Sequence, residues 1–481
     1  MGEDVKTLLI DGRWLGAGDG QTIDVVAPST GQKIAQISRG TVQDINAAVI
    51  AARRAFDGVW GATPALERGR LLCRLGARIL ECAQELAQIE ARDTGKTMKL
   101  ARNDIAATAR YFEYYGGAAD KIHGETIPFF QGYQVMILRE PRGVAGHIIA
   151  WNYPAQMFGR TIAAALAAGN TTVLKPAEQA CLSVIRLTEL AIEVGIPPGV
   201  INLVTGYGQE AGAALSCHPG IDFLSFTGSP EVGTQVQKAA ADNHVPCVLE
   251  LGGKSPQIVF DDADINKALP VIVSAIIQNT GQTCSAGSRV LIERSIFEEF
   301  LAALAKRINA VRVGSHEADL DCGPVISRVQ YDHVQGFLDR AREEGIQIIG
   351  EGKIDASASA GGYYIRPTLL GPVDESHELA QEEIFGPVLV AIPFDDEDDA
   401  VRIANGTQYG LIAGVWTENG ARQMRLAKRL RVGQVYINGY GAGGGVELPF
   451  GGFKRSGHGR EKGFEALREY TVAKTVVVNH M

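Results

Sequence analysis

The chain has 481 residues, of which 46% are hydrophobic and 21% charged, a composition typical of a folded globular protein with more than one domain. Its formal net charge is -9 and it contains no run of lysine or arginine, which argues against nucleic-acid binding. The N-terminal segment lacks the features of a secretory signal, and no apolar run reaches the ~18 residues of a membrane span. Seven scattered cysteines without metal-ligand or redox spacing indicate free thiols and favour a cytoplasmic location.

The N-terminal third is predicted to be mainly helical. A strand pair is expected at 8–14 and 22–26, followed by helices between residues 42 and 122. The stretch 66–95 keeps apolar residues at helical spacing, which predicts one long helix that ends at Gly95. A strand-like pair follows at 134–139 and 143–150.

From residue 143 onward, short strands alternate with helices. This pattern predicts a parallel α/β sheet with right-handed crossovers, and a second α/β series is expected from about 255 to 450. The tail at 470–478 is predicted to be a lone strand, and we expect it to be available for pairing with another chain.

Cys284 stands between Gly281 and Gly287, just before a predicted strand. A tight turn of this kind exposes the sulfur atom and directs backbone N–H groups toward whatever is bonded to it, as a nucleophile requires. A buried cysteine that acts as a small apolar side chain explains this segment equally well on its own.

Two further polar residues follow apolar strands. Glu250 closes the strand-like segment 246–250, where desolvation would raise its pKa toward the range useful to a general base. Asn152 follows the strand-like segment 146–150, so its amide could donate to a developing oxyanion. Taken singly, a paired surface carboxylate and a structural turn explain these residues at least as well.

The segment from Gly228 to Gly233 opens a helix directly after a strand. Glycines and Ser229 at a helix start leave backbone N–H groups and a hydroxyl for a pyrophosphate, although no GxGxxG fingerprint is present. Lys175 and Glu178 follow another strand and suit ribose hydroxyls. The nine histidines form no HxH or HExxH pair, so the sequence predicts no metal site and no histidine partner for the cysteine.

Seven short motifs in one order resemble the aldehyde dehydrogenase superfamily, in its NAD-dependent, non-acylating, hydrolytic branch. They are WNYP at 151–154, KPAE at 175–178, FTGSPEVG at 226–233, ELGGKSP at 250–256, GQTCSAGSR at 281–289, EEIFGPV at 382–388 and PFGGFKRSGHGRE at 449–461. Because the N-terminal third is compatible too, the resemblance covers essentially the whole chain.

The resemblance implies an α/β fold with three parts. These are a Rossmann-like NAD-binding domain (1–122 and 142–252), an α/β catalytic domain (253–452) and a small β oligomerisation element (123–141 and 466–481). It also implies a homodimer or homotetramer as the partner arrangement.

The resemblance further implies a role for each matching residue. Cys284 would attack the aldehyde as a thiolate, Asn152 and the Cys284 backbone N–H would hold the oxyanion, and Glu250 would activate the hydrolytic water. The implied catalytic residues are Cys284, Glu250, Asn152 and Lys175. The implied cofactor contacts are Ile148, Trp151, Lys175, Glu178, Gly208, Gly228, Ser229, Val232, Leu251, Glu383 and Phe385. Glu178 favours NAD over NADP, because a carboxylate repels a 2′-phosphate.

Substrate choice is less well specified. The implied substrate contacts are Tyr153, Met157, Arg160, Gln278 and Phe450. The loop 439–449 contains no arginine or lysine and little bulk, which favours a neutral aliphatic or aromatic aldehyde. An acidic semialdehyde is the main alternative, because Arg160 matches one of two arginines that bind such a carboxylate in similar enzymes, whereas Gln278 stands at the other place. A coenzyme A-acylating dehydrogenase, a cysteine hydrolase and a protein without catalytic activity are weaker alternatives.

One position departs from the family pattern. Thr161 stands where many relatives carry a lysine, which can join a proton relay with a glutamate that resembles Glu461. The sequence leaves open whether such a relay operates in this chain.

Overall fold

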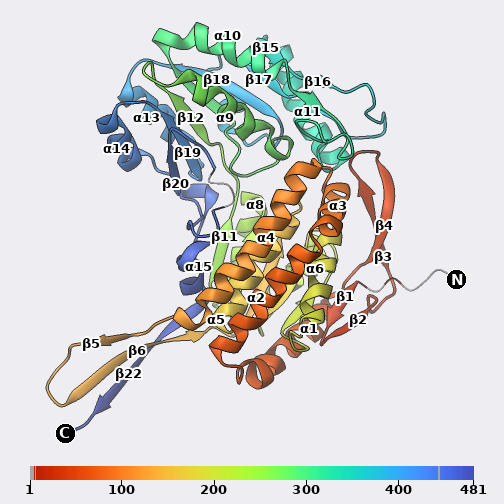
Figure 1. Ribbon diagram of the computed structural model, residues 1–481, viewed down its shortest axis with the longest axis vertical. Coiled ribbons are helices and arrows are strands. Elements are labelled where there is room, and N and C mark those ends of the chain that lie inside the picture. The colour runs from red at the N-terminus through yellow and green to blue at the C-terminus, as the bar shows by residue number, and fades with distance from the viewer. Residues whose placement is uncertain (1–4, 6, 442–444) are drawn as a thin grey trace.

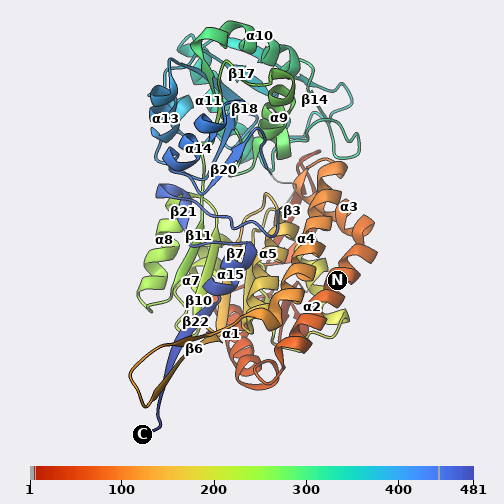
Figure 2. The ribbon, with the colours of Figure 1, turned by 60° about the vertical axis from the view of Figure 1, so that its left-hand side comes forward.

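The computed structural model describes residues 5, 7–441 and 445–481, and it shows two large sheets covered by helices and a projecting β arm (Figures 1 and 2). The first sheet has eight strands, which in spatial order are β2 (Arg13–Leu15), β1 (Leu8–Ile10), β9 (Ile201–Leu203), β8 (Thr171–Pro176), β7 (Val144–Ile149), β10 (Phe223–Thr227), β11 (Cys247–Glu250) and β21 (Gly457–His458).

The centre of this sheet is parallel and contains a topological switch point. The chain runs from β7 outward through β8 to β9, and then returns to place β10 and β11 on the other side of β7. Ligands of open α/β sheets bind at the carboxyl ends of the strands where the order reverses. The ends of β7, β10 and β11 are therefore where a site is expected.

Helices pack on both faces of the first sheet. They are α1 (Val42–Ala55), α2 (Ala65–Glu81), α3 (Ala83–Thr94), α4 (Met98–Ala118), α5 (Pro154–Ala168), α6 (Leu182–Glu193), α7 (Ala213–Ser216) and α8 (Pro230–Ala241). In α5 every residue except Gln156 is buried, which matches its small and apolar sequence on all sides. Because α5 begins directly after residues 151–153, a rigid core element anchors that turn.

The second sheet, in the upper part of Figure 1, forms its own α/β layer. Its strands in spatial order are β15 (Ile348–Glu351), β17 (Thr368–Leu370), β18 (Val388–Phe394), β13 (Arg289–Glu293), β12 (Pro256–Val259), β19 (Ile412–Trp416) and β20 (Gln434–Ile437). The main helices around it are α9 (Ile265–Ile277), α10 (Phe297–Ile308), α11 (Arg328–Glu343), α13 (Glu397–Asn405) and α14 (Gly420–Arg429). The predicted α/β fold with two strand–helix series is confirmed.

A three-stranded sheet projects from the lower part of the molecule (Figure 1). Its order is β22 (Thr471–Asn479), β6 (Tyr133–Pro141), β5 (Glu125–Ile127), with β22 antiparallel to β6 along its whole length. The predicted C-terminal strand is confirmed, and it pairs with β6 of the same chain. Since β22 is the outer strand of this sheet, its other edge faces away from β6.

Three details of the sequence prediction are wrong. Residues 8–14 do not pair with 22–26, because a turn at Asp11 and Gly12 folds them into the β1–β2 hairpin, and β3 (Thr22–Ala27) pairs with β4 (Gln32–Ser38). The long helix predicted over 66–95 breaks at Cys82, whose backbone is not helical, and becomes α2 and α3. The strand-like segments 134–139 and 143–150 lie in different sheets as β6 and β7. Pairing of strands depends on distant partners, which local periodicity does not report.

In the part of the chain that the structure describes, no helix combines the length and apolar character needed to cross a bilayer.

Candidate active site

A cavity of about 490 Å³ opens at the carboxyl ends of β7, β10 and β11, where the switch point predicts a site. Many residues that the sequence singled out line it together: Trp151, Asn152, Gly228, Ser229, Glu250, Leu251, Cys284, Glu383 and Phe385. The structure thus gathers segments that lie more than two hundred residues apart in the chain.

Cys284 follows a strained turn at the end of α9. Asn279 and Thr280 both have positive φ angles of 49° and 58°, which L-residues adopt rarely and mainly at functional sites. At Gly281 (φ 74°), an added Cβ would lie 2.1 Å from the carbonyl oxygen of Gly386, so only glycine fits. This tight turn sets the cysteine at the wall of the cavity.

The thiol of Cys284 packs beside an apolar cluster formed by Leu411, Ile412 and Phe450. Burial raises the pKa of this thiol to about 12, while the positive charge of Arg160 acts in the opposite direction. The sulfur is therefore protonated in the resting protein, and it needs a base or a nearby positive charge to become a nucleophile.

Glu250 is the last residue of β11, and only 2% of its surface is exposed. In the described structure neither of its carboxyl oxygens has a hydrogen-bond partner. Burial, and next the negative charge of Glu461, raise the pKa of Glu250 well above its usual value. A raised pKa makes a carboxylate a stronger proton acceptor, as a general base requires.

Asn152 lies in the turn between β7 and α5, with 4% of its surface exposed. Its Nδ2 donates to the carbonyl oxygen of Gln282 at 3.0 Å, which ties it to the loop that carries Cys284. An amide nitrogen has two hydrogens, so a second one is left for a group bonded to the cysteine. This is the arrangement that an oxyanion donor requires.

The opposite wall of the cavity offers groups for a dinucleotide. Ser229 caps α8 and accepts from the backbone N–H of Val232 at 3.3 Å, and the positive end of this helix, which begins at Pro230, faces the cavity. The rings of Trp151 and Phe385 meet edge to face at 5.4 Å between centroids. The backbone N–H of Gly253 donates to Glu383 at 2.8 Å.

Other predicted cofactor contacts lie outside the residues that line this cavity. Lys175, which is buried, and Glu178, which is partly exposed, form an ion pair of 2.9 Å at the end of β8, the next strand of the sheet. Ile148 is 8% exposed in β7, whereas Gly208 and Val232 are solvent-exposed at the starts of their helices. Burial raises the pKa of Glu383, inside the cavity, to about 7.

Arg160, a predicted substrate contact, is engaged within the protein. Its guanidinium forms a buried ion pair with Glu461, donates to Thr227 Oγ1 at 3.2 Å and lies 5.7 Å from the centre of the Phe450 ring. Thr161 does not reach Glu461, because its hydroxyl donates back to the carbonyl oxygen of Met157 at 2.8 Å. Arg160, and not residue 161, therefore pairs with this glutamate, which also accepts from Ser225 Oγ at 2.9 Å.

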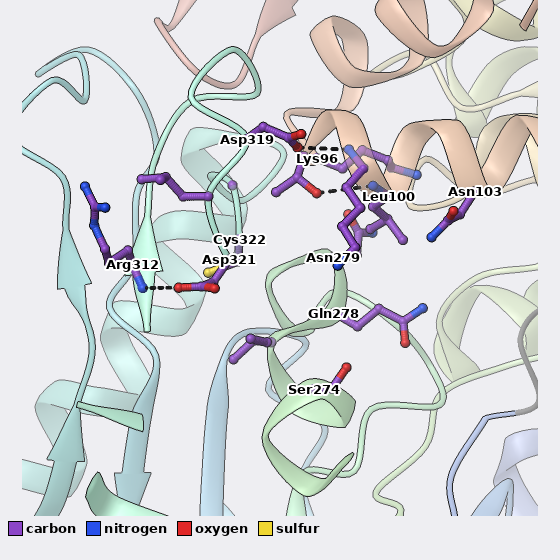
Figure 3. A pocket seen from close by; sticks show the side chains of 15 residues that line it. Lys96, Leu100, Asn103, Ser274, Gln278, Asn279, Arg312, Asp319, Asp321 and Cys322 are labelled. Atoms are coloured by element: carbon purple, nitrogen blue, oxygen red, sulfur yellow. Dashed lines mark hydrogen bonds between the residues drawn. The ribbon is translucent and has the colours of Figure 1, made fainter. Parts of the chain in front are cut away.

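Gln278 lies away from the cysteine cavity. It lines a larger cavity of about 630 Å³ between α4, the end of α9 and the segment 312–323 (Figure 3). Met157 is 3% exposed and belongs to the core around α5, while Tyr153 is half-buried against the same core. Part of the loop 439–449, at 442–444, lies outside the described residues.

The sequence did not single out several residues that the structure brings to the site. Gln330, His333 and Phe337 come from α11, and Tyr409 from the segment before β19. Gln330 Nε2 donates to the carbonyl oxygen of Phe385 at 2.9 Å. This bond fixes the loop that carries Phe385, a predicted cofactor contact. On an ordinary amphipathic helix such residues carry no local signal.

Among the described residues, no three His, Cys, Asp or Glu side chains are grouped to hold a metal ion.

The comparisons with known proteins agree with this geometry. Residues 14–476 match the model of the aldehyde dehydrogenase family. The chain belongs to this family. A presumptive aldehyde dehydrogenase of Burkholderia cenocepacia is 62% identical, with a TM-score of 0.98 over 98% of this chain and 100% of that one. The predicted family, fold and enzyme class are confirmed.

Two further relatives are informative about ligands. The NAD+ complex of a Staphylococcus aureus betaine aldehyde dehydrogenase is 38% identical, with a TM-score of 0.96 over 99% of this chain and 95% of that one. A mitochondrial benzaldehyde dehydrogenase of Antirrhinum majus is 41% identical over 98% of this chain and 88% of its own length.

Proposed function

We propose that the enzyme oxidises a neutral aliphatic or aromatic aldehyde to the free carboxylic acid, with NAD as the acceptor. The observation that carries this proposal is the convergence of Cys284, Glu250 and Asn152 on one cavity that also contains a helix N-terminus. A nucleophile, a base and an oxyanion donor are the groups needed to make and then hydrolyse a thioester.

The far wall of the cavity fits NAD. The start of α8 with its Ser229 cap suits a pyrophosphate, and Trp151 and Phe385 together give the cavity an aromatic surface for a flat ring. At Gly252 an added Cβ would lie 2.1 Å from Glu383 Oε2, so this glycine lets that carboxyl group reach the cavity. The NAD+ complex of the related betaine aldehyde dehydrogenase supports the same assignment, and Glu178 favours NAD over NADP.

The reaction follows from the residues around the cavity. The thiol of Cys284 loses its proton to solvent, and the sulfur bonds to the aldehyde carbon; the resulting alkoxide accepts hydrogen bonds from Asn152 Nδ2 and the Cys284 backbone N–H. NAD, when bound, supplies the hydride acceptor. Glu250 then removes a proton from water, which attacks the thioester carbon and displaces the cysteine sulfur. The products are the carboxylic acid, NADH and the thiol, which is regenerated when the sulfur takes the proton held by Glu250.

The substrate preference rests on the use of Arg160. Because this guanidinium pairs with Glu461 and contacts Thr227, it is not available as a dedicated partner for a substrate carboxylate. The side chains beside the cysteine, Leu411, Ile412 and Phe450, are apolar and suit a hydrocarbon group. The related benzaldehyde dehydrogenase is in line with an aromatic substrate.

One observation favours an acidic semialdehyde as the second candidate. Lys462 follows Glu461 directly in the chain, and its ammonium group lies 4.9 Å from the centre of the Phe450 ring. It adds positive charge near Cys284, which a substrate with a distal carboxylate would meet favourably.

The test is a panel of propanal, benzaldehyde, succinic semialdehyde and betaine aldehyde, scored by kcat/KM from NADH absorbance, with NAD and NADP and without coenzyme A. We expect the neutral aldehydes to give the highest kcat/KM and free acid to accumulate. A higher kcat/KM for succinic semialdehyde would shift the assignment to the second candidate. A requirement for coenzyme A would make the enzyme acylating, and no nicotinamide-dependent change with any aldehyde would refute the proposal.

The Glu250→Gln variant tests the hydrolytic half separately. Its expected signature is a burst of about one NADH per site, followed by turnover slowed by about 10²–10⁴, because a general base contributes this much. An unchanged steady-state rate would remove Glu250 as the base.

We further propose that the arm of 123–141 and 466–481 joins subunits into a homodimer or homotetramer, and that the enzyme is cytoplasmic. In the same proposal the NAD-binding domain comprises 1–122 and 142–252, and the catalytic domain comprises 253–452. The outer edge of β22 and exposed Val472, Val477 and Val478 support the arm's role. Deleting 471–481 should give a monomer by light scattering, and an unchanged mass would refute it. The free cysteines support a reducing compartment.

A further inference from the structure

A buried charge cluster lies behind the turn that carries Asn152. Lys96 connects α3 to α4, and its side chain is 0% exposed. Its Nζ donates to Glu90 Oε1 at 3.1 Å, to Asp104 Oδ2 at 2.6 Å and to the backbone carbonyl oxygen of Asn152 at 3.0 Å. An ammonium group has three hydrogens, so this geometry uses all of them.

The partners of Lys96 are themselves fixed. Glu90 accepts from Ser183 Oγ of α6 at 2.5 Å, and Asp104 accepts from Gln156 Nε2 of α5 at 2.7 Å. The cluster therefore joins α3, α4, α5 and α6 around one ammonium group. Burial alone would lower the pKa of Lys96, but Asp104 and Glu90 reverse this effect and leave it raised, so the lysine stays charged.

A second donor, from the loop that leads to Cys284, reaches the same carbonyl oxygen of Asn152. Asn279 Nδ2 donates to Asn152 O at 2.9 Å and to Gln282 O at 3.2 Å. Figure 3 shows Lys96 and Asn279 approaching each other from the helical layer and from the end of α9. The Asn152 carbonyl group is thus held between a rigid cluster and the strained loop that leads to Cys284.

We propose that Lys96 is a positioning residue for the oxyanion donor, holding the Asn152 peptide group so that the side-chain amide faces the Cys284 adduct. The proposal rests on the function proposed above for Asn152. A carbonyl group fixed by two donors fixes the plane of its peptide, and with it the direction of the Asn152 side chain. A displacement of such a group by about 1 Å lowers the reaction rate on the order of 10²-fold.

The Lys96→Met variant tests the proposal. We expect kcat/KM for the aldehyde to fall by about 10²-fold, with the Kd for NAD changed less than about twofold. Lys99→Met is the matched control, because Lys99 is an exposed lysine that lines the same cavity of Figure 3 and lies three positions away. It should keep the wild-type rate.

A double-mutant cycle separates positioning from general damage. In the Asn152→Ala background, Lys96→Met should lower the rate by less than about threefold more, because the group that it positions is gone. If Lys96→Met retains wild-type kcat/KM, or if its effect multiplies in full on that of Asn152→Ala, the proposal is wrong. If Asn152→Ala alone has no effect, the proposed role of Asn152 fails instead.

The folding risk of this variant has a specific remedy. Lys96→Met leaves two buried carboxylates without their cation, which can prevent folding. Pairing it with Asp104→Asn removes one of those charges and leaves Glu90 bonded to Ser183. The folded double variant should show the same loss of kcat/KM, and a wild-type rate would overturn the proposal.

Discussion

The protonation state of the Cys284 thiol gives the sharpest prediction. Burial raises its pKa from the ordinary 9.0 to about 12. At about pH 7 the thiolate fraction is then about 10⁻⁵, roughly a thousand times lower than for the ordinary value. Each added pH unit should raise that fraction about tenfold up to about pH 11, because the group remains far below its pKa.

Alkylation by iodoacetamide in the free enzyme measures this fraction, with the labelled Cys284 peptide followed by mass spectrometry. We expect the rate to keep rising by about tenfold per pH unit between about pH 7 and 9, whereas a small-molecule thiol, with a pKa of about 8.5, levels off. In Arg160→Met the rate should be lower at each pH, because the charge that favours the thiolate is lost. A plateau for Cys284 below about pH 9 would refute the reasoning.

Three further predictions follow from the same surroundings. The Kd for NAD should fall about tenfold from about pH 6 to 8, because Glu383, a proposed NAD contact with a pKa of about 7, becomes a carboxylate acceptor in this range. In a fluorescence titration, the Glu383→Gln variant should show no such pH dependence of the Kd. Gly281→Ala should cost about 1–3 kcal/mol in unfolding free energy, whereas Gly117→Ala, which meets open space on a helix, should not destabilise. Glu461→Gln removes the negative charge that helps raise the pKa of Glu250, so the ascending limb of the steady-state pH profile should move to lower pH; an unmoved limb would contradict this.

Residues at the ends of strands could be predicted from the sequence because their signals are local. Glu250 closes β11 and Ser229 caps α8, as the apolar strands and the glycines before the helix indicated. Their gathering in one cavity followed from the parallel topology, which alternating strands and helices predict. The family motifs added Glu383 and Phe385, which have no strand-end or cap pattern of their own.

The remaining site residues depend on contacts that no local pattern reports. His333 reaches the cavity from α11, and Lys96 follows a stretch that resembles an ordinary helix stop. The partner of Glu461 could not be predicted either. The sequence drew attention to Thr161, but its hydroxyl is satisfied within α5, and the longer side chain of Arg160 reaches the glutamate.

The engagement of Arg160 explains how two nearby carboxyl groups come to have different roles. Its guanidinium pairs directly with Glu461, so that glutamate has a counter-charge inside the protein. Glu250 has no such direct partner within the described residues, and burial together with the charge of Glu461 raises its pKa well above the usual value. Burial likewise raises the pKa of the Cys284 thiol, because a charge without a partner is costly in a buried site. Glu461 is held in an ion pair with Arg160, whereas the raised pKa of Glu250 makes its carboxylate a stronger proton acceptor, which suits the base role proposed for it.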